Sequence, residues 1–417
     1  MTLLIKGATL LTPGQADLHG KKRDILIEGG KLIRIGSRLN PSGKVKTISL
    51  PNLHVSPGWF DSSVSFGEPG YEERETIENG LRVAALSGFT GIVLNSNSKP
   101  VPDTSGDIVF LKDQGRNALT ELFPLGSLSM GSKGEDLAEL LDMQGAGAIG
   151  FSDYKAPIEN PNLLKLALLY TQSFKGLVYS HPLDNQVAKG GQVHEGTVAV
   201  RLGLKGVAPL AEHLRIARDL DILEYTGGSL HIPTISSAES VSRIAEAKKK
   251  GLDVTCSVAI SHLLFTEKNL EDFDTNFKTQ PPLRSEADRK TLIKGLKTGI
   301  IDFACSDHSP LDIEEKRLEF DRAAFGSLGL ESAFGALNKL LGAEESTAIL
   351  CRGRKRYGLQ EVQLNEGETA NLTLFNPEPE FVLESESLES TSKNSMFQGA
   401  TLKGKVYGVI RGAKSNL

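Results

Sequence analysis

The chain has 417 residues, of which 24% are charged, and a formal net charge of −5 at pH 7. Single cores rarely grow beyond about 300 residues, so this length fits one large domain plus a smaller module. Without a basic field, nucleic acid and anionic lipid are disfavoured as partners. No run approaches about 18 consecutive apolar residues, and the sparse cysteines suit a reducing compartment. We therefore expect a cytoplasmic protein that binds neither nucleic acid nor membrane.

The first fifty residues alternate apolar and polar positions around Gly29-Gly30, a pattern typical of β-hairpins. From Val55 onward, short runs that end in polar residues alternate with stretches of helical period, which predicts a parallel sheet built from βα units. The eight runs are Val55–Asp61, Gly91–Asn97, Glu121–Ser127, Ala146–Asp153, Leu177–His181, Ser229–Ser236, Asp253–Ala259 and Ile300–Asp307. Together they predict an α/β fold of the TIM (β/α)8 barrel type.

Helices are expected between these runs, and further strands after them. The helical stretches are Glu78–Leu86, Glu135–Met143, Leu163–Phe174, Glu239–Lys250 and Glu286–Lys297. Beyond the barrel, Asn371–Phe375 and Leu402–Val409 predict strands that join the N-terminal hairpins, whereas the Glu- and Ser-rich stretch Glu378–Lys393 predicts a mobile, solvated loop. We therefore expect a small β-sandwich module formed by residues 1–54 and 360–417, and a barrel domain formed by residues 55–359.

Polar residues end several of the predicted strands, where a TIM barrel carries its chemistry. Runs one, four, five and eight end in Asp61, Asp153, His181 and Asp307. Carboxylates and an imidazole can share a metal or transfer protons, so these residues alone predict a single-metal hydrolase. The alternative is that they cap neighbouring loops, and for Asp61 we prefer this structural role.

Several segments resemble the dihydroorotase branch of the amidohydrolase superfamily, of the type found beside aspartate transcarbamoylase. They are Gly58–Asp61 with Glu68–Gly70, Asn97–Pro100, Gly150–Asp153, Pro281–Arg284, Asp302–Pro310, Phe325-Gly326, Gly329–Glu331 and Asn394–Val406. Motifs in the family's order over nearly the whole chain are more specific than a single short pattern.

The resemblance implies a metal-assisted hydrolysis in which zinc-bound hydroxide opens the cyclic amide of dihydroorotate and an aspartate shuttles the proton. By this resemblance, Asp307 corresponds to the catalytic aspartate, which also reaches the metal, and His181 and Asp153 correspond to metal ligands. Asn97 keeps a substrate-binding position, and Gln280 stands where the family has an asparagine.

The same resemblance shows that several of the family's metal-binding and substrate-binding residues are replaced in this chain. Ser63, Ser65 and Thr234 replace histidine ligands, and neutral hydroxyls bind divalent ions poorly. On the substrate side, Gly67 replaces an arginine and Leu311 replaces a histidine. The three surviving ligand positions should hold a metal weakly, so we expect no cofactor at full occupancy.

Three hypotheses follow. The favoured one is a dihydroorotase-like protein without activity of its own, kept as a structural partner of aspartate transcarbamoylase in pyrimidine biosynthesis. The second is an active cyclic amidohydrolase that interconverts N-carbamoyl-aspartate and dihydroorotate through a reduced metal site holding zinc. The third is a small-molecule binding module that reuses the barrel mouth. A homo-oligomer is expected.

Overall fold

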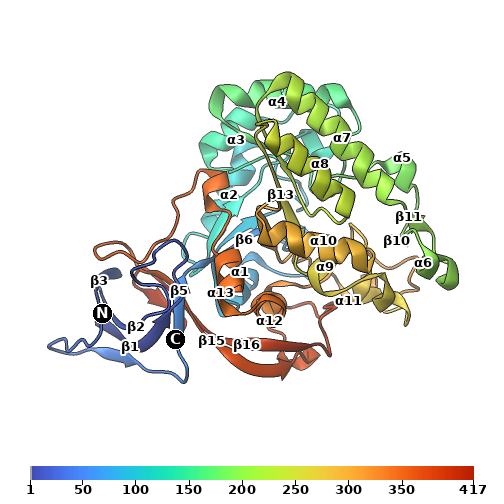
Figure 1. The fold of residues 1–417 in the computed structure, drawn as a ribbon. Coiled ribbons are helices and arrows are strands. Elements are labelled where there is room, and N and C mark those ends of the chain that lie inside the picture. The colour runs from blue at the N-terminus through green and yellow to red at the C-terminus, as the bar shows by residue number, and fades with distance from the viewer. Residues whose placement is uncertain (1) are drawn as a thin grey trace.

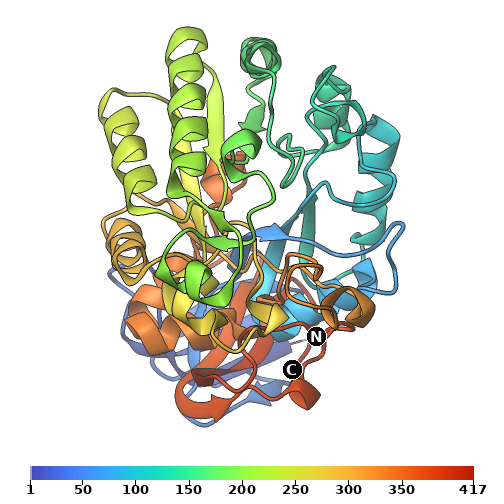
Figure 2. The same cartoon turned by 90° about the vertical axis from the view of Figure 1, so that its right-hand side faces the viewer.

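The computed structural model describes residues 2–417. A β module that carries both chain termini lies beside a larger α/β unit, as both ribbon views show (Figure 1, Figure 2). Within residues 2–417, no helix is both long enough and apolar enough to cross a membrane.

The β module is built on one eight-stranded sheet from both ends of the chain. Its strands are β1 (Thr2–Leu10), β2 (Lys22–Glu28), β3 (Lys31–Gly36), β4 (Lys46–Ile48), β5 (His54–Pro57), β15 (Asn371–Val382), β16 (Thr401–Arg411) and β17 (Lys414–Ser415). They follow the order β17-β16-β15-β5-β1-β2-β3, with β4 paired to β1. Strand β5 pairs with β1 on one side and β15 on the other, so the two ends of the chain are directly hydrogen-bonded. The sheet thus joins strands from both ends of the chain as predicted, although within residues 2–417 these strands form one sheet where a β-sandwich was expected.

The α/β unit contains two parallel sheets. One consists of β6 (Trp59–Val64), β7 (Phe89–Leu94) and β8 (Glu121–Pro124), and the other of β9 (Leu177–Tyr179), β12 (Ser229–Ile232), β13 (Val254–Ala259) and β14 (Phe303–Cys305). Parallel bridges through Phe151 link β8 to β9, and a Val64–His308 bridge links β14 to β6. Parallel pairing therefore passes through eight segments in the predicted order, and we call this arrangement the strand ring. The α/β class is confirmed.

The predicted first run is divided between the two units. Strand β5 belongs to the β module and β6 to the strand ring, with Gly58 between them. A Cβ at Gly58 would lie 2.0 Å from the Asn371 side chain and 2.1 Å from that of Thr90, so only glycine fits there. The close approach lets the chain pass from one sheet to the next in a single residue.

Helices connect the strands of the ring. Their bounds are α1 (Ile77–Leu86), α2 (Ser105–Gln114), α3 (Leu140–Ala146), α4 (Pro161–Thr171), α5 (Asn185–Ala188), α6 (Thr197–Leu202), α7 (Pro209–Thr226), α8 (Ala238–Lys249), α9 (Ser261–Leu264), α10 (Glu286–Lys297), α11 (Ile313–Lys316), α12 (Leu330–Leu341) and α13 (Ala343–Leu350). Two-residue strands β10 (Val193–His194) and β11 (Gly206–Val207) pair with each other. The five predicted helices are present, although α3 starts five residues later than expected. The longer helices α7, α12 and α13 were not predicted. Helix α2 was also not predicted, because only Ile108 and Leu111 of it are buried and its apolar periodicity is weak.

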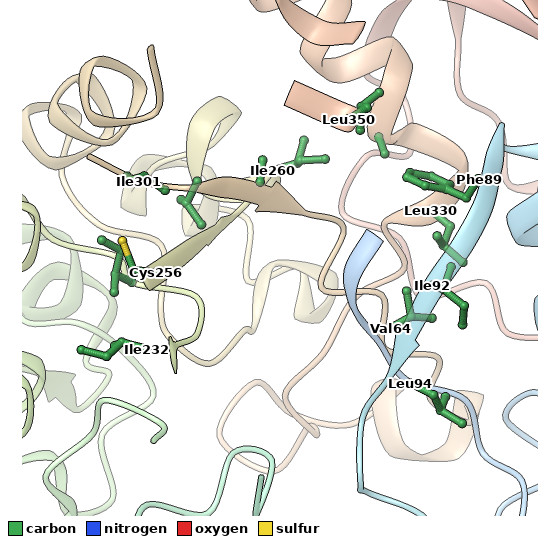
Figure 3. Packing of buried hydrophobic residues seen from close by; sticks show 14 of the residues in the cluster. Val64, Phe89, Ile92, Leu94, Ile232, Cys256, Ile260, Ile301, Leu330 and Leu350 are labelled. Carbon is green, nitrogen blue, oxygen red and sulfur yellow. The ribbon is translucent and has the colours of Figure 1, made fainter. Parts of the chain in front are cut away.

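The main core lies between the strand ring and its helices. In Figure 3, Val64, Ile92, Ile232 and Cys256 from the ring strands belong to the same cluster as Leu330 of α12. A separate cluster packs inside the β module. Burial of these apolar side chains is the main favourable term that holds the ring and helices together.

The prediction of a mobile loop at Glu378–Lys393 is wrong. Strand β15 continues to Val382, and the following residues, 383–399, pack across α1 and α12; we call them the C-terminal strap. Thr391 donates backbone and side-chain hydrogen bonds of 3.0 and 2.7 Å to Glu75, and the Ser390 hydroxyl donates to Glu331 at 2.7 Å. The strap has the polar composition of a solvated loop, but its hydroxyl groups donate hydrogen bonds to carboxylates on other elements.

Trp59 joins the strand ring to the β module, and its replacement should therefore be costly. The fully buried ring lies 4.7 Å from Phe334 of α12 and 5.4 Å from Phe375 of β15, centroid to centroid. We expect Trp59→Ala to lower the free energy of unfolding by about 4 kcal/mol, since it leaves a large cavity. Chemical unfolding followed by circular dichroism measures this. The control Tyr225→Ala removes an aromatic side chain from a residue that is 82% exposed and should stay within about 0.5 kcal/mol of wild type.

Candidate functional site

An ion pair lies at the carboxyl ends of the ring strands. Lys155 Nζ is 2.9 Å from Asp307 Oδ2, and the two side chains are only 13% and 10% exposed. The Ser63 hydroxyl donates to Asp307 Oδ1 at 3.4 Å, and the Asn95 amide donates to the hydroxyls of Ser63 and Ser65 at 3.2 and 3.1 Å. These five residues, which we call the mouth cluster, come from the ends of β6, β7 and β14 and from the loop after Phe151.

Asp307 adopts a backbone conformation that places its carboxylate over the ring. Its φ of 48° is left-handed, which aspartate tolerates better than most residues. The neighbouring Ser306 N–H donates to Asp61 at 3.0 Å, and the Ser306 hydroxyl accepts from the His308 N–H at 3.2 Å. These contacts on both sides hold the strained conformation, a feature that concentrates at functional sites.

Charges in the mouth cluster follow from burial and from the ion pair. Burial alone would lower the pKa of Lys155, but the adjacent Asp307 carboxylate outweighs it and raises that pKa above its usual range. Lys155 therefore stays protonated at neutral pH. Burial, helped by the positive charges of Lys155 and Arg215, lowers the pKa of His181 to about 3, so this imidazole is neutral. Gln280 Nε2 lies 3.4 Å from His181 Nε2, which brings two predicted site residues into contact.

Asp153, a predicted metal ligand, instead binds the loop after β8. Its carboxylate accepts from the backbone N–H groups of Leu128 and Ser129 at 2.9 Å each, and from the hydroxyls of Ser127 and Ser129 at 2.9 and 2.5 Å. Within residues 2–417, no three His, Cys, Asp or Glu side chains form a group that could hold a metal. The predicted ligand set of Asp153, His181 and Asp307 is thus not brought together.

The other predicted residues have separate environments. Asp61 accepts backbone hydrogen bonds from Ser63 and Ser306, and burial raises its pKa to about 6. It links β6 to β14, which is the structural role preferred for it. Thr234 is buried, and its N–H donates to Ser257 at 3.1 Å. Asn97 is half-buried, two residues beyond Asn95.

Lys155 and Asn95 were not predicted from the sequence. Lys155 follows the Gly150–Asp153 motif by two residues, at the end of the fourth predicted run, and Asn95 ends the apolar stretch of β7. The sequence signal that could have identified Lys155 is its position two residues after Asp153, the carboxylate that ends the fourth predicted run. Its partner Asp307 is 152 residues away in the chain, so only the folded structure pairs them.

Comparison with known proteins identifies the family. A family model described as Dihydro-orotase-like matches residues 53–240. The chain is 37% identical to a dihydroorotase of Pelotomaculum thermopropionicum over 421 residues, which cover 99% of this chain and 98% of the relative. The chain belongs to the dihydroorotase-like family. A dihydroorotase of Desulforapulum autotrophicum is 35% identical over 415 residues, covering 97% of this chain and 96% of the relative.

Solved structures of related fold agree with the α/β architecture of this family member. An L-hydantoinase (dihydropyrimidinase) from Arthrobacter aurescens superposes with a TM-score of 0.85 at 22% identity, covering 99% of this chain and 95% of that one. A D-hydantoinase (dihydropyrimidinase) from Thermus sp. gives 0.82 at 20% identity, covering 99% and 94%. These likenesses show an amidohydrolase-type fold.

Two predictions about this dihydroorotase-like chain are corrected by the relatives. The favoured hypothesis, a protein without activity kept as a structural partner, is wrong, because relatives that align end to end are dihydroorotases. The expectation of no cofactor is overturned with it, because zinc was expected under the alternative of an active amidohydrolase, which these relatives favour.

The structure disagrees with the relatives on this point, because the donor groups of this chain do not fit a zinc ion in the arrangement described. The hydroxyls of Ser63 and Ser65 accept hydrogen bonds from the Asn95 amide, and the Asp153 carboxylate accepts hydrogen bonds from the loop after β8. The ammonium group of Lys155 lies against Asp307, where a second cation would be repelled. The chemistry considered below therefore runs through side chains of the protein.

Breaking the Lys155–Asp307 pair should destabilise the fold. We expect Lys155→Met to lower the free energy of unfolding by about 3 kcal/mol, because it leaves a largely buried carboxylate unpaired. The double variant Lys155→Met/Asp307→Asn should recover most of this loss. Denaturant unfolding of wild type, both single variants and the double variant measures the coupling. Additive effects would contradict a direct interaction.

His308 links acid pH to stability. Burial lowers its pKa from 6.5 to about 3, and its Nδ1 accepts from the N–H groups of Gly329 and Leu330 at the start of α12, at 3.3 and 3.4 Å. This acceptor role requires the neutral imidazole. As pH falls below 6.5, the unfolded chain binds a proton that the folded chain does not, so the free energy of unfolding decreases between about pH 6.5 and 3.

We therefore expect His308→Gln, which keeps an acceptor, to show a weaker loss of stability on acidification. The difference in slope should reach at most about 1.4 kcal/mol per pH unit. Unfolding midpoints between pH 7 and pH 4 measure it. His54→Gln in the β module is the matched control and should keep the wild-type slope. Parallel curves for wild type and His308→Gln would show that His308 does not contribute.

Proposed function

We propose that this protein is an active cyclic amidohydrolase that interconverts dihydroorotate and N-carbamoyl-aspartate. The observation that carries the proposal is the full-length alignment with dihydroorotases at 35–37% identity. The mouth cluster supports it, because a nearly buried carboxylate, an ammonium group and amide donors converge at the strand ends where this fold carries chemistry.

Asp307 is the proposed proton acceptor. Its carboxylate takes a proton from a water molecule while the water oxygen forms a bond to the ring carbonyl carbon. The carbon–nitrogen bond of the cyclic amide then breaks, and the leaving nitrogen receives the proton from Asp307. In the reverse direction the same carboxylate removes a proton from the ureido nitrogen as the ring closes.

Positively charged and amide groups around Asp307 are the proposed binding groups for the substrate. Lys155 is ion-paired with Asp307 and is proposed to stabilise the negative charge that develops on the carbonyl oxygen. Asn97 and Gln280 are the proposed contacts for the substrate, whose carboxylate would also be attracted by Lys155. The neutral imidazole of His181 can donate or accept a hydrogen bond beside Gln280.

The decisive experiment measures turnover of dihydroorotate and of N-carbamoyl-aspartate by the purified full chain, with and without added zinc. We expect activity in both directions, and a decrease in kcat of at least about 100-fold in Asp307→Asn, because the amide cannot accept the proton. Asp142→Asn, an exposed residue of α3, is the matched control and should keep wild-type activity.

Two outcomes would reject the proposal. Absence of turnover in either direction, for a chain shown to be folded by circular dichroism, would exclude the activity. Full activity in Asp307→Asn would exclude Asp307 as the proton acceptor. Binding of dihydroorotate without turnover would instead favour the small-molecule binding hypothesis. Association with aspartate transcarbamoylase and homo-oligomer formation stay predictions, which size-exclusion chromatography after coexpression can test.

A further inference from the structure

Arg354 is a buried cation without an anionic partner. It begins the short 3-10 helix Arg354–Tyr357 after α13 and is only 6% exposed. Within residues 2–417, its Nε and Nη2 atoms have no hydrogen-bond acceptor. Its guanidinium lies 5.2 Å from the ring centre of Phe60 and 5.8 Å from that of Phe123. Aromatic faces offset part of the cost of burying this charge, but they do not accept its hydrogen bonds.

Arg354 lines a cavity between the amino ends of the ring strands and the β module. The cavity has a volume of about 720 Å³, within the range of small-molecule sites. Its walls include Phe123 of β8 and Arg411 and Lys414 of the β module. We call it the basal cavity, because it lies at the opposite end of the strands from Asp307.

The charges around the basal cavity favour an anion. Its cationic residues are Lys31, Arg354, Arg411 and Lys414, and its acidic residues are Glu121, Glu361 and Glu368. Glu121 is already paired with Arg411 at 3.0 Å, and Lys414 donates to the backbone carbonyl of Asn117 at 2.7 Å. Burial lowers the pKa of Arg354, and the nearby positive charge of Arg411 lowers it further, whereas Glu121 opposes both. The unfilled donors therefore lie on Arg354.

The absence of a side chain at Gly91 leaves room for the Arg354 guanidinium. A Cβ at Gly91 would lie 2.7 Å from Arg354 Nη2, so the strand carries glycine where the arginine passes. Planar guanidinium groups bind phosphate and carboxylate through two parallel hydrogen bonds. Phe123, which is half-buried on the cavity wall, offers an apolar surface for the remainder of a ligand.

We propose that the basal cavity binds a small molecule through an oxyanion group, phosphate or carboxylate, held by Arg354 and Arg411. The oxyanion offsets the buried positive charge of Arg354, and the volume beyond it accommodates the body of the ligand. This site is separate from the mouth cluster, and the proposal does not depend on the amidohydrolase activity.

The test measures binding of pyrophosphate and of citrate to the full chain by calorimetry and by thermal shift, at matched ionic strength with sodium chloride as reference. We expect both the heat of binding and a raised unfolding temperature for at least one of the two anions. Comparing their affinities distinguishes phosphate from carboxylate as the preferred group. Arg354→Met should weaken binding at least about tenfold, since it removes a charge-assisted bidentate contact.

Two further variants make the result interpretable. Arg354→Met replaces an unpaired buried charge by an apolar side chain, so it should fold, and circular dichroism checks this. Arg411→Gln tests the second guanidinium independently and should also weaken binding. Arg201→Gln, an exposed arginine of α6 paired with Glu271, is the control and should bind as wild type. Absence of binding of either anion to wild type, or equal binding in Arg354→Met, would overturn the proposal.

Discussion

Parallel hydrogen bonding through eight chain segments is the constraint on which the rest of this molecule depends. It places the carboxyl ends of all ring strands at one edge, so polar residues that are far apart in sequence meet there. The amino ends meet at the opposite edge, against the β module, where the Arg354 guanidinium lies 5.2 Å from the Phe60 ring and 5.8 Å from the Phe123 ring. One pattern of main-chain pairing therefore produces two chemically different ends.

The mouth cluster shows how a single side chain changes the electrostatics of a strand end. Lys155 supplies one positive charge next to Asp307 and contributes to the low pKa of His181. Because the ammonium group is compact and fixed by its partner, it offers donors to a negatively charged group. Ser63 and Asn95 extend the same hydrogen-bond chain, so the cluster holds the geometry of Asp307 from both sides.

Polar segments in this protein owe their order to specific partners. The C-terminal strap is rich in serine and glutamate, yet Ser390 and Ser392 are buried. Glu75 and Glu331, on or near the helices beneath it, accept their hydrogen bonds from the strap. The strap packs over the ring through both kinds of contact, because Leu383, Leu388, Met396 and Phe397 belong to the main core cluster while Ser390 and Ser392 donate hydrogen bonds to other elements.

The sequence by itself determined the α/β class, the order of the parallel segments, five of the thirteen α-helices in residues 2–417 and the origin of the terminal sheet in both ends of the chain. These features depend on local periodicity, which survives in a one-dimensional pattern. It also indicated the family, which the full-length relatives confirm.

Tertiary structure decided which polar residues meet. Asp153 accepts hydrogen bonds from the loop after β8, Asp307 pairs with Lys155, and the C-terminal strap donates hydrogen bonds to Glu75 and Glu331. None of these pairings could be read locally, since the distance along the chain between the partners reaches 316 residues. A hydrogen bond or ion pair depends on spatial approach within about 3 Å, which only the closed ring and its packed helices provide.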